Sequence, residues 1–173
     1  MLKKHFHSLK PLMIKISCGN KADIALSQRR WEKDMCVIVK KGKLKINENC
    51  NFRRGLQLRV LDNGSLSIGE HCFINTNVSI TCRENITIGD NSKIANNVVI
   101  VDHDHDYRNG NEGYKTGKVI IGKNVWIGAN CVILRNTEIG DNCVVAAGSV
   151  VKGSFESNSI IFGNSGKCTS KKY

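Results

Sequence analysis

The sequence of 173 residues lacks a long apolar run. Lys3 and Lys4 stand near its start, but His5, His7 and Pro11 interrupt the apolar stretch that a membrane span or a secretory leader would need. We therefore expect no membrane span and the cytoplasm as the compartment. The length suits one domain with a continuous apolar interior and is too short for two ordinary domains.

The sequence also lacks any Cys-x-x-Cys pair, although it contains eight cysteines. Their spacing has to decide between packing and a zinc site or disulfide framework. Five of them follow an isoleucine by four residues: Cys18, Cys50, Cys72, Cys131 and Cys143, after Ile14, Ile46, Ile68, Ile127 and Ile139. We interpret most of the cysteines as small buried hydrophobic residues and expect no metal, with a metal or disulfide role as the alternative.

Acidic residues are scarce in the first third of the chain. The net charge is +11, and residues 1–54 carry fourteen Lys and Arg against four acidic residues, so ten of the eleven net charges lie there. A basic face attracts polyanions such as nucleic acid, anionic glycan or the phosphates of a nucleotide cofactor; alternatively, it is a solvated face. No aromatic interleaving or nucleic-acid-binding motif accompanies the charge, so we expect no nucleic acid partner.

What the sequence does contain is a repeat of β-branched residues with a step of six. Six residues advance an α-helix by about 600°, which scatters the repeated positions, whereas extended backbone keeps them on one side because six is a multiple of two. The repeat therefore predicts short strands. Its members, with two interruptions, are Ile68, Ile74, Ile80, Ile88, Ile94, Ile100, Ile121, Ile127, Ile133, Ile139, Val145 and Val151.

Turn residues separate these anchor positions. A small or compact residue often lies four positions after an anchor, as at Ser92, Val98, Val125, Thr137 and Ser149. Asn and Asp, which tolerate left-handed backbone in turns, cluster just before it, as at Asn91, Asn97 and Asn142. Three strand-turn units would form one triangular coil, and stacked coils would bury a column of Ile and Val.

The longest interruption separates Ile100 from Ile121, which are 21 residues apart instead of six. Residues 101–118 between them are polar and glycine-rich, and long excursions from a compact fold are usually functional or disordered. They include His103 and His105. Because histidine is the side chain best placed to exchange a proton near neutral pH, this loop is the candidate catalytic segment.

The repeat resembles that of the hexapeptide-repeat acyltransferases, whose unit is an aliphatic residue, a glycine or similar, two variable residues and a small one. The resemblance covers residues 68–153 well and extends more loosely back to Ile46. It implies an all-β, left-handed parallel β-helix with a protruding loop. The handedness comes from the resemblance alone, since parallel crossovers are in general right-handed.

The resemblance also gives domain boundaries. We expect an irregular basic segment or cap over residues 1–43, the β-helix over 44–163 and a tail over 164–173. Within the first segment, residues 24–36 are expected to form a short helix or an irregular cap over the open end of the solenoid.

Around the loop, the resemblance narrows to galactoside, maltose and streptogramin acetyltransferases. Their catalytic histidine lies five residues after the anchor, which implies His105, five after Ile100. Their acceptor-site asparagine lies thirty residues earlier, which implies Asn75. Residues 121–129 resemble the signature that follows the loop, and imply that a neighbouring subunit and bound substrates cover Trp126. Packing of Trp126 beneath its own loop is the alternative.

The same resemblance implies acetyl-CoA as co-substrate and a homotrimer whose active sites lie between subunits. Residues 145–151 resemble the coil along which the family lays the pantetheine arm. The implied coenzyme contacts are Trp126, Ala129, Ala147, Lys152, Gly153 and Lys167. Two prolines of the family pattern are missing in this region, in residues 152–157 and 163–167.

The implied reaction moves an acetyl group from the thioester to a sugar hydroxyl. It needs a base for the hydroxyl proton and donors for the oxyanion. His105 is the predicted base, Asn75 would hold the acceptor hydroxyl or the intermediate, and His103 ranks second. Arg83 stands where galactoside enzymes place an acidic sugar contact, which favours an anionic acceptor such as a surface polysaccharide. His103 and Trp126 are further expected acceptor contacts. Asp102, Asp104 and Asp106 could orient an imidazole, although acidic loop residues are more often solvated than catalytic.

Other functions stay open on the sequence alone. N-acetylation of a nucleotide-linked amino sugar would use the same residues. A non-catalytic, polyanion-binding solenoid would use the basic region and has no need of the loop. A γ-class carbonic anhydrase needs three zinc-binding histidines, but His103 and His105 are two residues apart, where that family spaces them five apart, and His71 is the only other histidine in the repeats.

Overall fold

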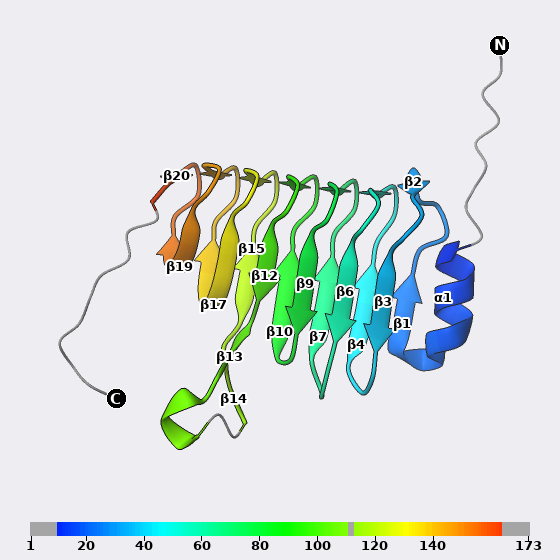
Figure 1. Ribbon diagram of the computed structural model, residues 1–173. Helices are drawn as coiled ribbons and strands as arrows, with labels where there is room; N and C mark the ends of the chain where they lie inside the picture. The colour runs from blue at the N-terminus through cyan, green and yellow to red at the C-terminus, as the bar shows by residue number, and fades with distance from the viewer. Residues whose placement is uncertain (1–9, 111–112, 164–173) are drawn as a thin grey trace, which may run out of the picture.

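The computed structural model describes residues 10–110 and 113–163, and it shows a solenoid of stacked parallel coils (Figure 1). A helix, α1 (Lys10–Cys18), lies against one end, followed by the short 3-10 helix η1 (Gly19–Lys21). A hairpin leaves the side of the stack. The chain is the left-handed parallel β-helix that the repeat and its resemblance predict.

Every coil has three flat faces. The first face contains β1 (Ala22–Ile24), β4 (Lys43–Ile46), β7 (Ser65–Ile68), β10 (Asn85–Ile88), β15 (Val119–Ile121) and the C-terminal parts of β17 (Val132–Ile139) and β19 (Val150–Phe155). The second face contains β2 (Arg30–Trp31), β5 (Asn51–Phe52), β8 (Phe73–Ile74), β11 (Lys93–Ile94), β16 (Trp126–Ile127), β18 (Val144–Val145) and β20 (Ile160–Ile161).

The third face contains β3 (Cys36–Val39), β6 (Gln57–Val60), β9 (Ser79–Cys82), β12 (Val99–Val101) and the N-terminal parts of β17 and β19.

The faces meet at three corners. In one coil, the first corner comprises residues 69–72, the second comprises 75–78 and the third comprises 83–84. Because successive coils repeat this path, one corner recurs as a row along the solenoid.

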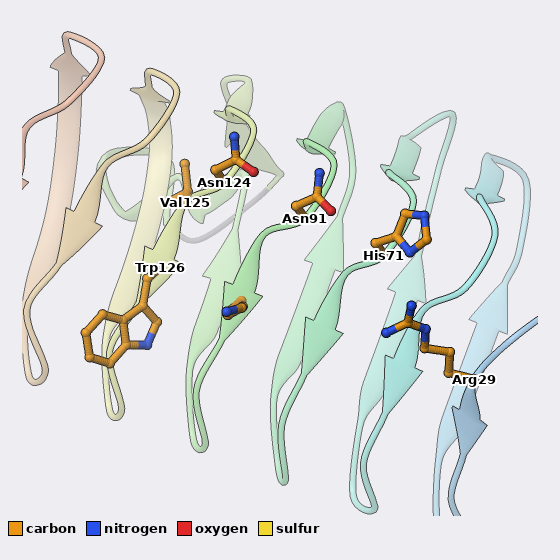
Figure 2. A pocket seen from close by; sticks show the side chains of 7 residues that line it. Arg29, His71, Asn91, Asn124, Val125 and Trp126 are labelled. Carbon is orange, nitrogen blue, oxygen red and sulfur yellow. The ribbon is translucent and has the colours of Figure 1, made fainter.

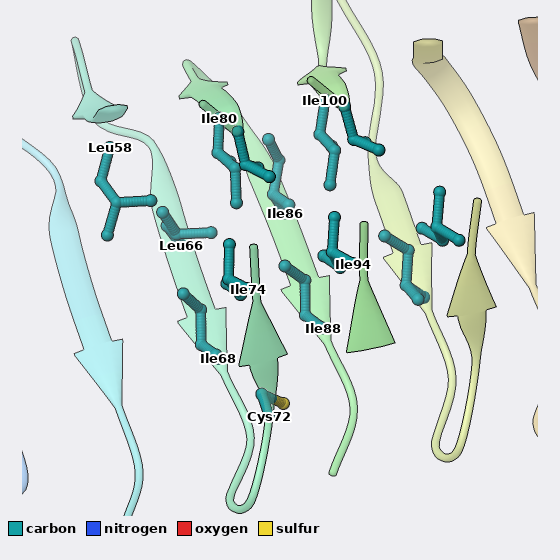
Figure 3. Packing of buried hydrophobic residues seen from close by; sticks show 14 of the residues in the cluster. Leu58, Leu66, Ile68, Cys72, Ile74, Ile80, Ile86, Ile88, Ile94 and Ile100 are labelled. Carbon is teal, nitrogen blue, oxygen red and sulfur yellow. The ribbon is translucent and has the colours of Figure 1, made fainter. Parts of the chain in front are cut away.

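The predicted anchors form the core. All twelve, from Ile68 to Val151, are at most 2% exposed. Figure 3 shows the anchors from Ile68 to Ile100 among the packed side chains of the core. Parallel pairing holds them in register: Ile74 pairs with Ile94, and Ile94 with Ile127. Each coil thus supplies the inward side chains that cover its neighbours, and the prediction of buried anchors on short strands is confirmed.

The corners depend on residues that accept left-handed backbone. Asn91, Asn97 and Asn142 have φ between +57° and +59°, as their position before the inward small residue predicts. Close stacking explains the glycine after an anchor: a Cβ on Gly89 would lie 2.5 Å from the carbonyl carbon of Gly122 in the next coil. Asparagine and glycine therefore permit the tight spacing of the coils.

The N-terminal region differs from the expectation. The helix is α1, at Lys10–Cys18, and not within residues 24–36, where β1, β2 and β3 already form a first coil. The β-helix therefore begins at Ala22, earlier than residue 44. The repeat is hard to recognise in the first coil because Gln28, which is buried, occupies the position of the small residue. The Gln28 side chain donates to the carbonyls of Ala25 and Asn47 and accepts from the amide of Cys50.

Four of the five regularly spaced cysteines are buried at the first or second corner, as predicted: Cys50, Cys72, Cys131 and Cys143. Cys18 is the exception, since it lies half-buried on α1, where a spacing of four from Ile14 is simply helical. The seven cysteines within the described ranges are all free thiols.

No helix in the described part of the chain is long and apolar enough to cross a membrane. The predicted tail, 164–173, lies outside the described residues.

Candidate active site

The 101–118 segment leaves the solenoid, as predicted, and the structure places its exit at the third corner. β13 (His103–His105) and β14 (Tyr114–Thr116) pair antiparallel, with a 3-10 turn, η2 (Tyr107–Asn109), between them. The strands on either side stay in the stack, since Val119 pairs with Ile86 as a continuous coil would require. The loop is therefore a hairpin added to one corner.

Asp102, at the base of the hairpin, is completely buried. Its carboxylate accepts hydrogen bonds from the amides of Arg83 (2.9 Å) and Glu84 (2.8 Å) in the preceding coil. It also lies 3.1 Å from Nδ1 of His103. Asp102 is therefore not solvated but contacts an imidazole, the other alternative for the acidic loop residues, because the neighbouring corner supplies donors that replace water. Burial and the Asp102 carboxylate raise the pKa of the Cys82 thiol beside it, so this thiol stays neutral.

The two loop histidines share one face of the hairpin and meet the same ring. The Tyr114 ring lies 5.3 Å from the His103 ring, edge to face, and 4.8 Å from the His105 ring. The side chain of His103 is 14% exposed, and because a carboxylate only accepts, its Nδ1 carries the proton. His105 is exposed to solvent. His103 thus links Asp102 to Tyr114, whereas the His105 imidazole is free to meet a ligand.

Two ion pairs hold the hairpin in place. Asp104, between the histidines, lies 2.6 Å from Nε of Arg135 on β17, and Asp106 lies 2.8 Å from Nζ of Lys115 on the opposite strand of the loop. The first pair joins the loop to the solenoid and the second joins its two strands. Together with buried Asp102, they fix the orientation of His105 relative to the third corner.

Arg83 lies at this corner too, half-enclosed by the loop. Its guanidinium stacks on the Tyr114 ring at 3.5 Å and pairs with Asp62. Its Nε is buried without a hydrogen-bond partner among the described residues. A buried, unpaired donor of this kind is available to an acceptor group on a ligand.

Asn75 is not beside the histidines within one chain. It follows β8 at the second corner, where its side-chain oxygen accepts from the amide of Thr76 at 2.8 Å, while the hairpin leaves at the third corner. The whole third face separates the two positions. The sequence spacing of thirty residues therefore does not by itself assemble a site inside one subunit.

The residues expected to contact the coenzyme fall at two corners. Ala129 and Ala147 stack at the second corner, whereas Lys152 and Gly153 lie on β19 where it crosses the third corner. Lys167 lies outside the described residues. Trp126 stands on the outside of the second face and is 55% exposed, so the alternative that it packs beneath its own loop is wrong. The loop emerges from a different corner.

Sequence reasoning missed a groove beside Trp126, with a volume of about 660 Å³ (Figure 2). It runs along the first corner and the second face. The repeat itself could have indicated this groove, because its register pairs Lys93 with Trp126 on adjacent strands and so places both side chains on the same outer surface. Its cations, amides and indole suit an anionic or sugar ligand. The lining residues are Arg29, His71, Asn91, Lys93, Asn124, Val125 and Trp126.

Comparison with known proteins agrees with this architecture. A family model for bacterial transferase hexapeptide repeats matches residues 118–153, and one for the hexapeptide repeat of succinyl-transferase matches residues 65–101. A protein of Escherichia coli K12 named for lipopolysaccharide biosynthesis O-acetyl transfer, WbbJ, is 32% identical over 150 residues, covering 80% of this chain and 76% of that protein.

Two further relatives match in part. The galactoside O-acetyltransferase of Escherichia coli K12 is 38% identical over 57% of this chain and 50% of its own. A hexapeptide-repeat acetyltransferase of Vibrio cholerae O1 biovar eltor, solved with acetyl coenzyme A, has a TM-score of 0.59 and 30% identity, covering 66% of this chain and 63% of its own. With the WbbJ match over most of both chains, these findings show that the protein belongs to the hexapeptide-repeat acetyltransferase family.

Proposed function

We propose that this protein is an acetyl-CoA-dependent O-acetyltransferase whose acceptor is a sugar hydroxyl. The observation that carries the proposal is the exposed imidazole of His105, fixed against Tyr114 on a hairpin that Asp102 and the Asp104–Arg135 pair anchor to the solenoid. Acyl transfer to a hydroxyl requires a base positioned in this way. Two relatives, WbbJ and the galactoside enzyme, are named as O-acetyltransferases.

In the proposed reaction, Nε2 or Nδ1 of His105 accepts the proton as the sugar oxygen attacks the thioester carbonyl. The tetrahedral intermediate then collapses and expels the coenzyme A thiolate, which takes up the proton from the imidazolium. No covalent enzyme intermediate is needed when both substrates meet at the histidine. Hydrogen-bond donors near the carbonyl would stabilise the oxyanion.

The separation of Asn75 from the hairpin favours a site shared between subunits. We propose that Asn75 of one subunit faces His105 of another in a homotrimer, with the coenzyme beside Trp126, Ala129 and Ala147. An exposed indole on a flat face gains from such coverage, since leaving it in water is unfavourable. Lys152 and Gly153, at the third corner, would then contact the outer part of a coenzyme bound to the adjacent site.

For the acceptor, the buried Nε of Arg83 supports a sugar that carries an acceptor group, such as a carboxylate on a surface polysaccharide. Arg83 already stacks on Tyr114 and pairs with Asp62, so it would offer a directional hydrogen bond rather than an unscreened charge.

A thiol-release assay tests the proposed function. With acetyl-CoA and a panel of neutral, amino and acidic sugars, we expect release of coenzyme A thiol that depends on the sugar and is greatest with an acidic sugar bearing free hydroxyls. Mass spectrometry of the product should locate the acetyl group on oxygen. Acetylation on nitrogen of an amino sugar, or coenzyme binding without turnover on any sugar, would contradict the proposal.

Binding of the coenzyme is tested separately at Trp126. Trp126→Ala should weaken acetyl-CoA binding about tenfold in calorimetry, because a large aromatic contact is removed from the proposed interface. Ile38→Ala, which truncates an exposed apolar side chain at the other end of the solenoid, is the matched control and should bind normally. Equal affinity for both variants would remove Trp126 from the coenzyme site.

A further inference from the structure

The outer surface of α1 is apolar although nothing in the described chain covers it. Leu12, Met13 and Ile16 are 39%, 65% and 72% exposed. Helical spacing places the three within an arc of about 100°. The opposite side of the same helix already supplies the cap, since Pro11 is buried and Ile14 and Cys18 pack against the core. A helix that is apolar on both sides normally has a partner on each.

Basic residues predominate at this end of the solenoid. Lys10 and Lys15 flank the stripe on the helix, where Lys10 also donates to the carbonyl of Glu32 and Lys15 pairs with Asp23. Leu26, which is 52% exposed, lines a shallow hollow together with Lys15 and three acidic residues, Asp23, Glu48 and Glu70. The first two coils add lysines that point outward, such as Lys43 and Lys45 on β4. In total, residues 10–54 contain twelve Lys and Arg against four acidic residues, whereas residues 55–173 contain twelve against eleven. Residues 10–54 lie at the α1 end of the solenoid (Figure 1), so the apolar stripe and the basic residues occupy the same end.

We propose that this end, which we call the cap surface (α1 with Leu26 and the surrounding lysines), binds the surface of an anionic phospholipid membrane. Aliphatic side chains would enter the acyl boundary while lysines meet the headgroups, which is how interfacial helices bind. The long lysine stems allow both contacts at once. The proposal concerns peripheral binding, and it does not depend on the catalytic function.

Charge and side-chain type favour a membrane over other partners. A second copy of the chain would present the same positive end and be repelled. Nucleic acid would pair with the cations, but the aliphatic side chains would make no favourable contact with its phosphates. The stripe also has no aromatic ring for base stacking. An anionic bilayer satisfies both the lysines and the exposed Leu12, Met13 and Ile16.

The binding has a geometric consequence that rests on the proposed function. β1 and β10 are separated by three steps of the first face, roughly 15 Å at the usual strand spacing. The hairpin that carries His105 begins near β10, so a membrane under the cap surface would bring it within reach of a sugar attached to a lipid headgroup.

Vesicle sedimentation tests the proposal with a matched pair of variants. Ile16 and Ile160 are 72% and 73% exposed at opposite ends of the solenoid, and changing either to Glu alters the net charge equally. We expect the wild type to sediment with phosphatidylcholine vesicles containing phosphatidylglycerol, and much less with phosphatidylcholine alone. Ile16→Glu should weaken this binding at least tenfold, since it removes an inserted aliphatic side chain, whereas Ile160→Glu should bind within about twofold of wild type.

Thermal unfolding of the three proteins establishes that each is folded. The proposal is overturned if the wild type does not bind the anionic vesicles, or if Ile16→Glu and Ile160→Glu bind equally. If heparin and anionic vesicles bind the wild type and Ile16→Glu alike, the basic end is a general polyanion surface instead. None of these outcomes depends on acetyl transfer, so they are separate from failure of the proposed function.

Discussion

His105→Ala is expected to lower kcat for acetyl transfer by about 10²–10⁴-fold, the range that general-base catalysis typically contributes. Binding of coenzyme A and the thermal midpoint should stay near the wild-type values, because His105 is exposed and its truncation opens no cavity in the core. Steady-state thiol release and calorimetric binding of coenzyme A measure the two effects separately.

His103→Ala is the control for this experiment. It lies on the same face of the same short strand and contacts the same tyrosine, but its Nδ1 is occupied by Asp102. We expect a much smaller loss of turnover, together with some loss of stability, since Asp102 loses one of its partners. If His103→Ala abolishes turnover while His105→Ala keeps most of it, the base is the Asp102–His103 pair. If neither variant is impaired, the hairpin does not carry the chemistry.

Ile94→Ala is expected to reduce the free energy of unfolding by about 2–5 kcal/mol, the usual cost of truncating a fully buried aliphatic residue. Ile94 stacks between Ile74 and Ile127, so the cavity would touch the coils on both sides. Urea denaturation followed by far-UV circular dichroism measures the change.

The adjacent residue provides the comparison. Lys93 belongs to the same strand but points outward, and Lys93→Ala should change the free energy of unfolding by less than about 0.5 kcal/mol. Similar destabilisation by the two variants would show that the anchor column is not the main source of stability in this coil.

The coils from Ile68 to Val151 could be predicted because each repeats the same short-range pattern of anchor, turn asparagine and small inward residue. The first coil could not, since Gln28 and Trp31 replace the usual residues and are accommodated by contacts with the next coil. A short-range sequence pattern predicts a coil only where that coil packs with the same types of side chain as the others.

The candidate site was less accessible to sequence reasoning. The loop and its histidines follow from the 21-residue gap, but the burial of Asp102 depends on amide groups of Arg83 and Glu84, about twenty residues earlier in the chain. Likewise, the spacing between Asn75 and His105 says nothing of the corner at which each lies. Long-range stacking decides both features, and a linear motif does not record it.

The hairpin also bears on how such a protein can diversify. Because Val119 resumes the pairing with Ile86 that an uninterrupted coil would make, the strand pairing on both sides of the insertion does not depend on the length of the hairpin beyond buried Asp102. This one segment could therefore be exchanged or lengthened in evolution, and the acceptor changed, without any change in the packing of the solenoid core. The stacked coils can thus be kept while the hairpin at the corner changes. Transferring hairpins between paralogues is a direct way to alter the acceptor preference.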